Sequence, residues 1–260
     1  MIDNLLNKYI EKGNALQKSI FINNFKDLYK LDIFKPGLDL ILSESEIGNV
    51  TFELNIIDDL VQLRGCCLTH ERNVFNKVLN TFVKTYKHKI TLQKLNVGVL
   101  MHEMAHALEK QGRISLSQGF DQAIGNDLKG IGSAPHTIKY AVDKIMYQDL
   151  KLYPENQQSS ELFARLFQML AMSKEIGHFD DEFQFRVSDC EEFFKSSTMW
   201  IRDVFNVAAG ARVADYISSQ TAKIKFTEAN TRFTRKFTTE SEKKSWSSGA
   251  SSKIKSNFED

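Results

Sequence analysis

Two histidines and a glutamate in one short apolar run are suited to metal chemistry. The run contains the pattern His-Glu-x-x-His, formed by His102, Glu103 and His106. On a helix of about 3.6 residues per turn, residues four apart share one face, so the two histidines project towards a common point. That geometry suits two imidazoles that bind one zinc ion. Glu103 is displaced around the helix and is placed to accept a proton from a water molecule at the metal.

The alternative is a pair of ordinary core histidines. Leu100, Met104 and Leu108 form one apolar stripe of the expected helix, and Leu95 and Val99 lie on another, so the helix should be buried. An unsatisfied buried polar group costs roughly 1–3 kcal/mol, and a metal ion would satisfy both rings at once. The pattern in this context therefore favours a zinc site.

Composition excludes several classes of protein. The chain has 260 residues, 42% hydrophobic and 26% charged, with a net charge of +1, which is ordinary for a globular protein and does not indicate nucleic-acid binding. No apolar run approaches the roughly 18 residues of a membrane span. The N-terminus lacks a basic stretch followed by an apolar core, so we expect no cleavable signal peptide and synthesis in a bacterial cytoplasm.

The three cysteines do not indicate a disulfide framework. Cys66 and Cys67 are adjacent, and Cys190 stands alone. We expect all three to be small buried hydrophobic residues in a reducing compartment. Zinc ligation by cysteine is less favoured because the sequence has no C-x-x-C spacing.

Periodicity predicts an α+β fold that is mostly helical. Alternation predicts a strand at 49–57, and a second strand at 60–68 would complete a hairpin. The small sheet ahead of the motif helix is therefore expected to be antiparallel, with an edge strand able to pair with an extended substrate. Helices are expected in these ranges: two across 3–31 separated at Gly13, 71–86, the motif helix from about 92 to 112, 138–152, one from 159, 180–195 and 197–224.

Three segments are expected from these patterns. Residues 1–48 form an N-terminal helical segment that packs on the core, and residues 49–225 form the catalytic domain. Residues 226–260 are rich in Ser, Lys, Glu and Gly, which bury too little surface to fold alone, so we expect a disordered tail.

A third zinc ligand must come from elsewhere in the chain, because catalytic zinc normally has three protein ligands and an open position. The residues after the motif, 109–111, include no further histidine. A carboxylate from a later helix is the common solution, and Glu161 is our first choice because it opens a strongly amphipathic helix. The alternative role is a helix-start glutamate paired with Arg165. The other candidate ligands are Glu155, Glu175, Asp127 and His136.

Two motifs resemble the gluzincin peptidases, and within them the anthrax lethal-factor-type group. That group pairs a His-Glu-x-x-His-Ala-Leu/Val-Asp/Glu helix with a later Glu-x-Phe-Ala helix. Here residues 102–109 read His-Glu-Met-Ala-His-Ala-Leu-Glu, and residues 160–167 read Ser-Glu-Leu-Phe-Ala-Arg-Leu-Phe. The resemblance covers residues 91–172. It implies a zincin-like domain in which His102, His106 and Glu161 bind Zn²⁺.

The same resemblance implies an oxyanion-stabilising tyrosine shortly before the second motif. Tyr153 is the nearest match, while Tyr140 and His136 are the other candidates because the offset differs. Arg165 departs from the group, where an acidic residue is common. Glu109 is placed either to orient an imidazole or to face solvent.

These observations predict a zinc endopeptidase that acts on a protein substrate, with Glu103 as the general base. A small peptidase without a signal peptide, resembling a toxin domain, is typical of a bacterial effector that cleaves a host protein. The tail would then be either an export signal or an idle segment. The alternatives are a non-catalytic interaction protein stabilised by zinc and a hydrolase with a non-protein substrate.

Overall fold

The computed structural model describes residues 2–42, 50–55, 65–76, 80–112, 114–116, 119–176 and 183–206. The chain divides into two compact units, residues 1–75 with 82–212, and residues 76–81 with 213–260. Nearly all described residues belong to the first unit, which contains both motifs. The predicted tail at 226–260 lies outside the described residues.

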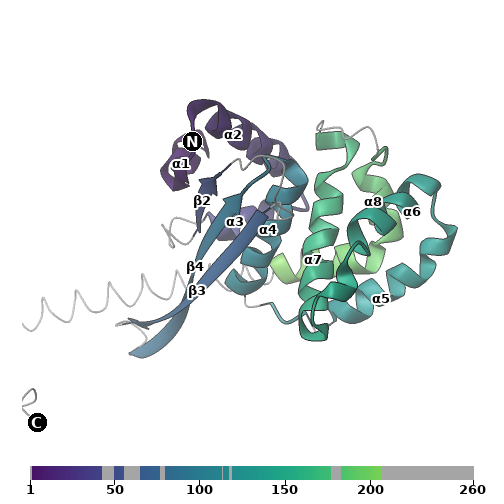
Figure 1. Cartoon of the computed structure of the whole chain (residues 1–260). Helices are drawn as coiled ribbons and strands as arrows, with labels where there is room; N and C mark the ends of the chain where they lie inside the picture. The colour runs from purple at the N-terminus through teal and green to yellow at the C-terminus, as the bar shows by residue number, and fades with distance from the viewer. Residues whose placement is uncertain are drawn as a thin grey trace, which may run out of the picture. The chain divides into compact units, whose positions relative to one another are not determined.

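The described part of the chain forms an α+β structure with one mixed sheet (Figure 1). The strands β1 (Ile10–Lys12), β2 (Val50–Leu54), β3 (Gly65–Asn76) and β4 (Thr81–Leu92) lie in the order β1-β2-β4-β3. β2 pairs in parallel with both β1 and β4. The predicted wholly antiparallel sheet is therefore wrong.

β3 and β4 form the hairpin of the sheet. They are neighbours joined by only four residues, and a parallel pair would need a much longer crossover, so they run antiparallel. Contacts of Thr69 with His88 and of Phe75 with Phe82 place these residues opposite each other. The predicted hairpin of 49–57 with 60–68 is wrong because β2 pairs with β4; residues 56–64 lie outside the described ranges.

The helix predicted at 71–86 is also wrong, because residues 71–76 belong to β3 and residues 81–86 belong to β4. The sequence signal for it is apolar residues spaced by four, and that spacing keeps side chains on one face of a strand as well as of a helix. Residues 71–75 are exposed on both faces of the hairpin. No contrast between a buried and a solvated face therefore appears in this part of the sequence.

The N-terminal segment forms α1 (Ile2–Tyr9), α2 (Ala15–Tyr29) and α3 (Lys35–Ile41). The two helices predicted around Gly13 are confirmed. Asn14 caps α2 by accepting the backbone N–H of Gln17, whose side chain bonds back to Asn14. The buried rings of Phe21 and Phe52 have centroids 4.7 Å apart, so the segment shares the core with the sheet.

The motif helix is α4 (Val97–Gln111), which starts later than predicted because Leu92 still belongs to β4. Asn96 caps it by accepting the N–H groups of Gly98 and Val99. A Cβ atom at Gly98 would lie 2.8 Å from the side chain of Met172, so the absence of a side chain there permits the close approach of the end of a later helix, α7 (Glu155–Ala171).

The second half of the described chain is helical. Its elements are α5 (Phe120–Gly130), α6 (His136–Ala141), a π-helical turn (Val142–Met146), α7, α8 (Val187–Phe193) and the helical residues 195–206. The single helix predicted at 138–152 is replaced by α6, the π turn and a 3-10 turn, Leu150–Leu152. Pro154 precedes α7, which begins four residues before the prediction. Among the described helices, none combines the length and apolarity that a membrane crossing requires.

Candidate metal centre

The candidate centre lies between α4 and α7, which pack along each other. The helices run antiparallel: Gly98 approaches Met172, His102 contacts Gln168, and His106 contacts Ser160. His102 and His106 therefore face α7. The structure brings them together with Glu161, the carboxylate that the sequence singled out.

The three side chains direct their donor atoms at a common point. The Nε2 atoms of His102 and His106 are 3.3 Å apart. The Nε2 of His102 is 3.6 Å from Oε2 of Glu161, and the Nε2 of His106 is 3.3 Å from Oε1. Donors held at 2.0–2.2 Å from a tetrahedral zinc ion are about 3.3 to 3.6 Å apart. The observed separations therefore fit a zinc ion, and this is the single group of three ligand-type residues found in the described chain.

Hydrogen bonds at the far side of each ring fix its tautomer. The Nδ1 of His102 is 3.1 Å from Oε1 of Gln168, which can only accept, so Nδ1 carries the proton. The Nδ1 of His106 is 3.2 Å from Oγ of Ser160, whose hydroxyl donates to Glu109 at 2.5 Å, so this Nδ1 also donates. With Nδ1 as the donor in each ring, both Nε2 atoms are the positions from which the rings would bind a metal ion. Without a metal, the Nε2 of His106 pairs with Oε1 of Glu161 at 3.3 Å.

The glutamate gives an independent test of the fit. Glu161 is buried, and its Oε2 is a buried oxygen without a hydrogen-bond partner in the described structure. Its nearest charged neighbours, Nε of Arg165 at 3.5 Å and Nε2 of His102 at 3.6 Å, form ion pairs without a hydrogen bond. The oxygen is therefore left unsatisfied, which proteins avoid. Zinc accepts two imidazoles and a carboxylate oxygen, so the residues present fit this ion.

The protonation of the ring nitrogens agrees with this arrangement at His102. Burial, and then the charge of His106, lower the pKa of His102 to about 4, so this ring is neutral at pH 7. Burial alone would lower the pKa of His106, but the hydrogen bond and charge of Glu161 outweigh it and raise the pKa. Burial opposes ionisation of Glu161, yet the two histidines and Arg165 outweigh burial and lower its pKa.

Glu103 lies under the first residues of β3. A Cβ atom at Gly65 would lie 2.8 Å from Oε1 of Glu103, so only glycine allows the strand this close. The backbone of Cys67 donates a hydrogen bond to Glu103. Burial and then Glu161 raise the pKa of Glu103 to about 7, against the opposing effects of His106 and Cys67. Such a carboxylate is tuned for taking up and releasing a proton near neutral pH.

Arg165 supports the third candidate ligand. Its Nε is 3.5 Å from Oε2 of Glu161, and its guanidinium donates to the carbonyls of Ile145, Met146 and Gln148. The pair predicted for Glu161 and Arg165 therefore exists beside the histidines and is compatible with a ligand role. The ring of Tyr153 lies 5.5 Å from the guanidinium carbon, so Tyr153 borders the centre through Arg165.

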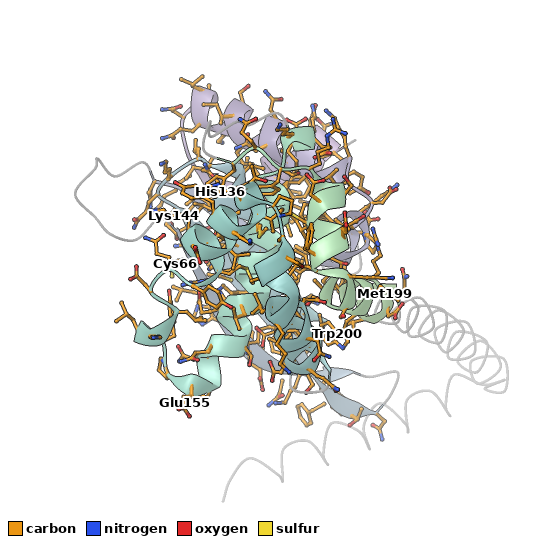
Figure 2. The ribbon with its side chains drawn as sticks, turned by 90° about the vertical axis from the view of Figure 1, so that its right-hand side faces the viewer. Cys66, His136, Lys144, Glu155, Met199 and Trp200 are labelled. Carbon is orange, nitrogen blue, oxygen red and sulfur yellow. The ribbon has the colours of Figure 1, made fainter. Side chains whose placement is uncertain are left out.

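The other candidate ligands are occupied elsewhere or exposed. Asp127 accepts the backbone N–H groups of Ser196 and Ser197 and so caps the start of the helix at residues 195–206. Glu175 accepts the N–H of Val187 at the start of α8. Glu155 and His136 are exposed, and Figure 2 shows them on α7 and α6. Tyr140, the other oxyanion candidate, stacks on His136 and contacts Phe183.

Sequence reasoning misses two side chains of the centre. The sequence indicates only a helix start at Ser160, but this residue links His106 to Glu109, so Glu109 reaches the imidazole through a hydroxyl. Gln168 is not singled out either. It follows Glu161 by seven residues, two turns along one face of α7, and that spacing is the signal that could have found it.

The cysteines differ from one another in burial. Cys190 is buried as expected, and Cys67 is partly buried. Cys66 is exposed, which corrects the expectation that all three are buried; Figure 2 shows its position. Alternation along β3 explains the difference, because Cys67 points to the side of α4 and Cys66 points away.

Comparison of the chain with family models, with curated proteins and with solved structures found no match in any of the three.

Proposed function

We propose that this chain is a zinc-dependent endopeptidase with a zincin-like catalytic domain. The observation that carries the proposal is the convergence of donor atoms from three residues at separations of 3.3 to 3.6 Å, with their outer hydrogen bonds set for metal binding. His102, His106 and Glu161 would bind Zn²⁺ and leave one position open. When bound, zinc lowers the pKa of water from about 16 towards 7 and polarises a carbonyl.

Glu103 performs the proton transfers in this mechanism. Its carboxylate accepts the proton of the attacking water and passes it to the leaving amine nitrogen, which balances the hydrolysis of one peptide bond. Burial raises the pKa of Glu103 in the metal-free protein, and the positive charge of a bound zinc ion would favour the ionised form that accepts a proton. Tyr153 would donate to the oxyanion, a contact worth about 3 kcal/mol.

β3 supports a polypeptide as the substrate. It is the last strand in the order β1-β2-β4-β3, so one row of its backbone groups has no neighbouring strand within the described sheet. Its first residues, at Gly65 and Cys67, approach Glu103. An extended peptide that pairs with this edge would carry its backbone past the general base.

The identity of the substrate is a separate part of the proposal. We propose that the enzyme is a bacterial effector that cleaves a host protein, on the sole basis of the two motifs that resemble those of the lethal-factor-type group. The competing function is a non-catalytic interaction protein stabilised by zinc. A structural zinc site closes its fourth position with a side chain and needs no buried carboxylate beside it.

A comparison of Glu103→Ala with Glu155→Ala tests the proposal. Both variants lose a carboxylate: Glu103→Ala loses it at the candidate centre, and Glu155→Ala loses it at an exposed position of α7. Zinc-loaded proteins are incubated with a host-cell lysate, and new peptide termini are identified by mass spectrometry. Wild type and Glu155→Ala should yield the same cleavage sites, whereas Glu103→Ala should yield none and still bind about one zinc per chain.

Two results would contradict it. Cleavage by Glu103→Ala at the wild-type rate would exclude the assigned base. Zinc bound without cleavage by wild type, together with unfolding on zinc removal, would favour the interaction protein.

A further inference from the structure

The hairpin carries a marked excess of positive charge. Residues 65–92 contain five Lys or Arg residues and one Glu, a net charge of +4, whereas the whole chain carries +1. The remainder of the chain is therefore slightly negative. The positive charge is concentrated on the element whose edge runs past Glu103.

The hairpin also has a defined outer face. Gly65 faces Glu103, and Thr69 bonds to His88, which bonds to Gln111 of α4, so these residues of β3 point to the helix. Alternate residues point away from it. They are all exposed and form what we call the outer row of β3: Cys66, Leu68, His70, Arg72 and Val74.

The outer face combines apolar and basic side chains. Leu68 is 52% exposed and Val74 is 50% exposed. Two cations of the hairpin are neutralised, Lys84 by Glu71 and Lys89 by Glu53, each at 2.7 Å. Arg72 and Lys87 form no ion pair among the described residues. By register, Lys87 lies opposite His70 and therefore on the outer face.

We propose that the edge of β3 and its outer row bind an extended acidic segment of the substrate, next to the bond that is cleaved. This rests on the proposed endopeptidase function. Main-chain hydrogen bonds to the edge would supply affinity, and Arg72 and Lys87 would select carboxylates. From Cys67 to Val74 the strand spans about 23 Å, so the acidic residues fall within about seven positions of the scissile bond.

A polypeptide fits this surface better than another polyanion. Backbone N–H and C=O groups of a strand edge are satisfied in pairs by a second strand, and phosphates accept but do not donate. Two of the five outer-row side chains are aliphatic, and they would pack against alternate apolar side chains of a strand.

Binding can be measured without cleavage by using the full-length, zinc-loaded Glu103→Ala protein. The probes are fluorescein-labelled peptides of about twelve residues, the length of β3, with alternating Glu and Val or alternating Lys and Val. Fluorescence anisotropy should show at least tenfold tighter binding of the Glu peptide, about 1.4 kcal/mol. N-methylation of alternate amides of the Glu peptide should abolish the difference, because it removes donors to the edge.

A charge-reversal pair localises the site. The double variant Arg72→Glu with Lys87→Glu should bind the Glu peptide about tenfold more weakly, or weaker still. The control is Lys129→Glu with Lys195→Glu, which makes the same change of net charge at two exposed lysines on α5 and the last described helix. The control should bind within about twofold of the parent. Thermal unfolding of each protein verifies that the variants are folded.

Three outcomes would overturn the inference. In the first, the charge-reversal variant binds the Glu peptide as tightly as the parent protein does. In the second, the N-methylated Glu peptide binds as tightly as the unmethylated one. In the third, single-stranded RNA or phosphatidylserine vesicles bind the parent more tightly than the Glu peptide does, and the charge reversal abolishes that binding. Failure of the proposed function is distinguishable: the acidic peptide would bind as expected, while wild type cleaves nothing. Cleavage by wild type without binding of the acidic peptide would remove the inference alone.

Discussion

The α4–α7 pair and the β3–β4 hairpin are both antiparallel pairs, but side chains between the helices are packed and hydrogen-bonded, whereas many side chains of the hairpin are exposed. Between α4 and α7, the polar atoms around His102 and His106 are engaged by residues of the other helix. Along the outer half of the hairpin, residues 71–75 are exposed. The contrast agrees with the two proposals, in which the reacting groups would lie on a packed scaffold and an open strand would accept the substrate.

The strongest change should follow from a substitution in the packed pair. Glu161→Gln keeps the shape of the side chain but removes the charge that would balance the cation. We expect zinc content to fall well below one per chain and peptidase activity to fall at least about 10³-fold. Atomic emission and the lysate assay measure the two quantities. Glu155→Gln, on the same helix, should change neither, and full zinc occupancy in Glu161→Gln would remove this residue from the centre.

A pair of phenylalanine truncations compares the two regions directly. Phe167 is fully buried and contacts the rings of Phe34, Phe163 and Phe205, whereas Phe82 is 68% exposed and contacts the ring of Phe75. Phe167→Ala should reduce the free energy of unfolding by about 3–5 kcal/mol. Phe82→Ala should cost less than about 1 kcal/mol.

Urea unfolding of wild type and of each variant, with each unfolding curve fitted separately, measures this difference. Similar losses for the two variants would mean that the hairpin ring is packed in solution, and the contrast between the regions would disappear.

A smaller effect is expected where Ser160 connects the two helices. Ser160→Ala removes the acceptor of His106 Nδ1 and the donor to Glu109 without touching a ligand atom. Loss of such an orienting group typically weakens metal binding 10–100-fold, and we expect about that change. Competition with a chromophoric chelator measures it. Ser159→Ala is the matched control, and a Ser160→Ala affinity equal to the control would show that the ring needs no orientation from this hydroxyl.

The weakest effect should be a pH dependence at the base of the hairpin. Burial lowers the pKa of His88, despite the opposing hydrogen bond with Gln111. The unfolded chain then binds more protons than the folded chain, so the stabilisation is present above a pH of about 6.5 and is lost as the pH falls below it. Unfolding free energies between about pH 7 and pH 5 should decline less steeply in His88→Asn than in wild type. An unchanged slope would show that this ring is not held neutral.

The centre can be anticipated because its chemistry is local in the sequence. His102, Glu103 and His106 lie within five consecutive residues, and Glu161 opens a second run with a strong apolar period. Both helices are recognisable because each contains a long apolar run, and most residues of α4 are buried. The connection through Ser160 and Gln168 depends on the relative rotation of two helices, which no local pattern encodes.

The sheet is predicted poorly for a physical reason. β2 pairs with β4 rather than with its successor in sequence, and such non-local pairing leaves no signal in either strand. β3 alternates only where α4 covers it, around Cys67 and Thr69. Beyond that point both faces meet solvent, so the alternation that identifies a half-buried strand is absent.

Arg165 ties the carboxylate of the centre to a distant part of the chain. Its guanidinium is held by the carbonyl oxygens that close the π turn of residues 142–146 and by Gln148, while its Nε faces Glu161. Neither imidazole has a hydrogen bond to that turn among the described residues. A rearrangement of the turn would thus release the carboxylate of Glu161 from Arg165, while the hydrogen bonds of His102 and His106 stay in place.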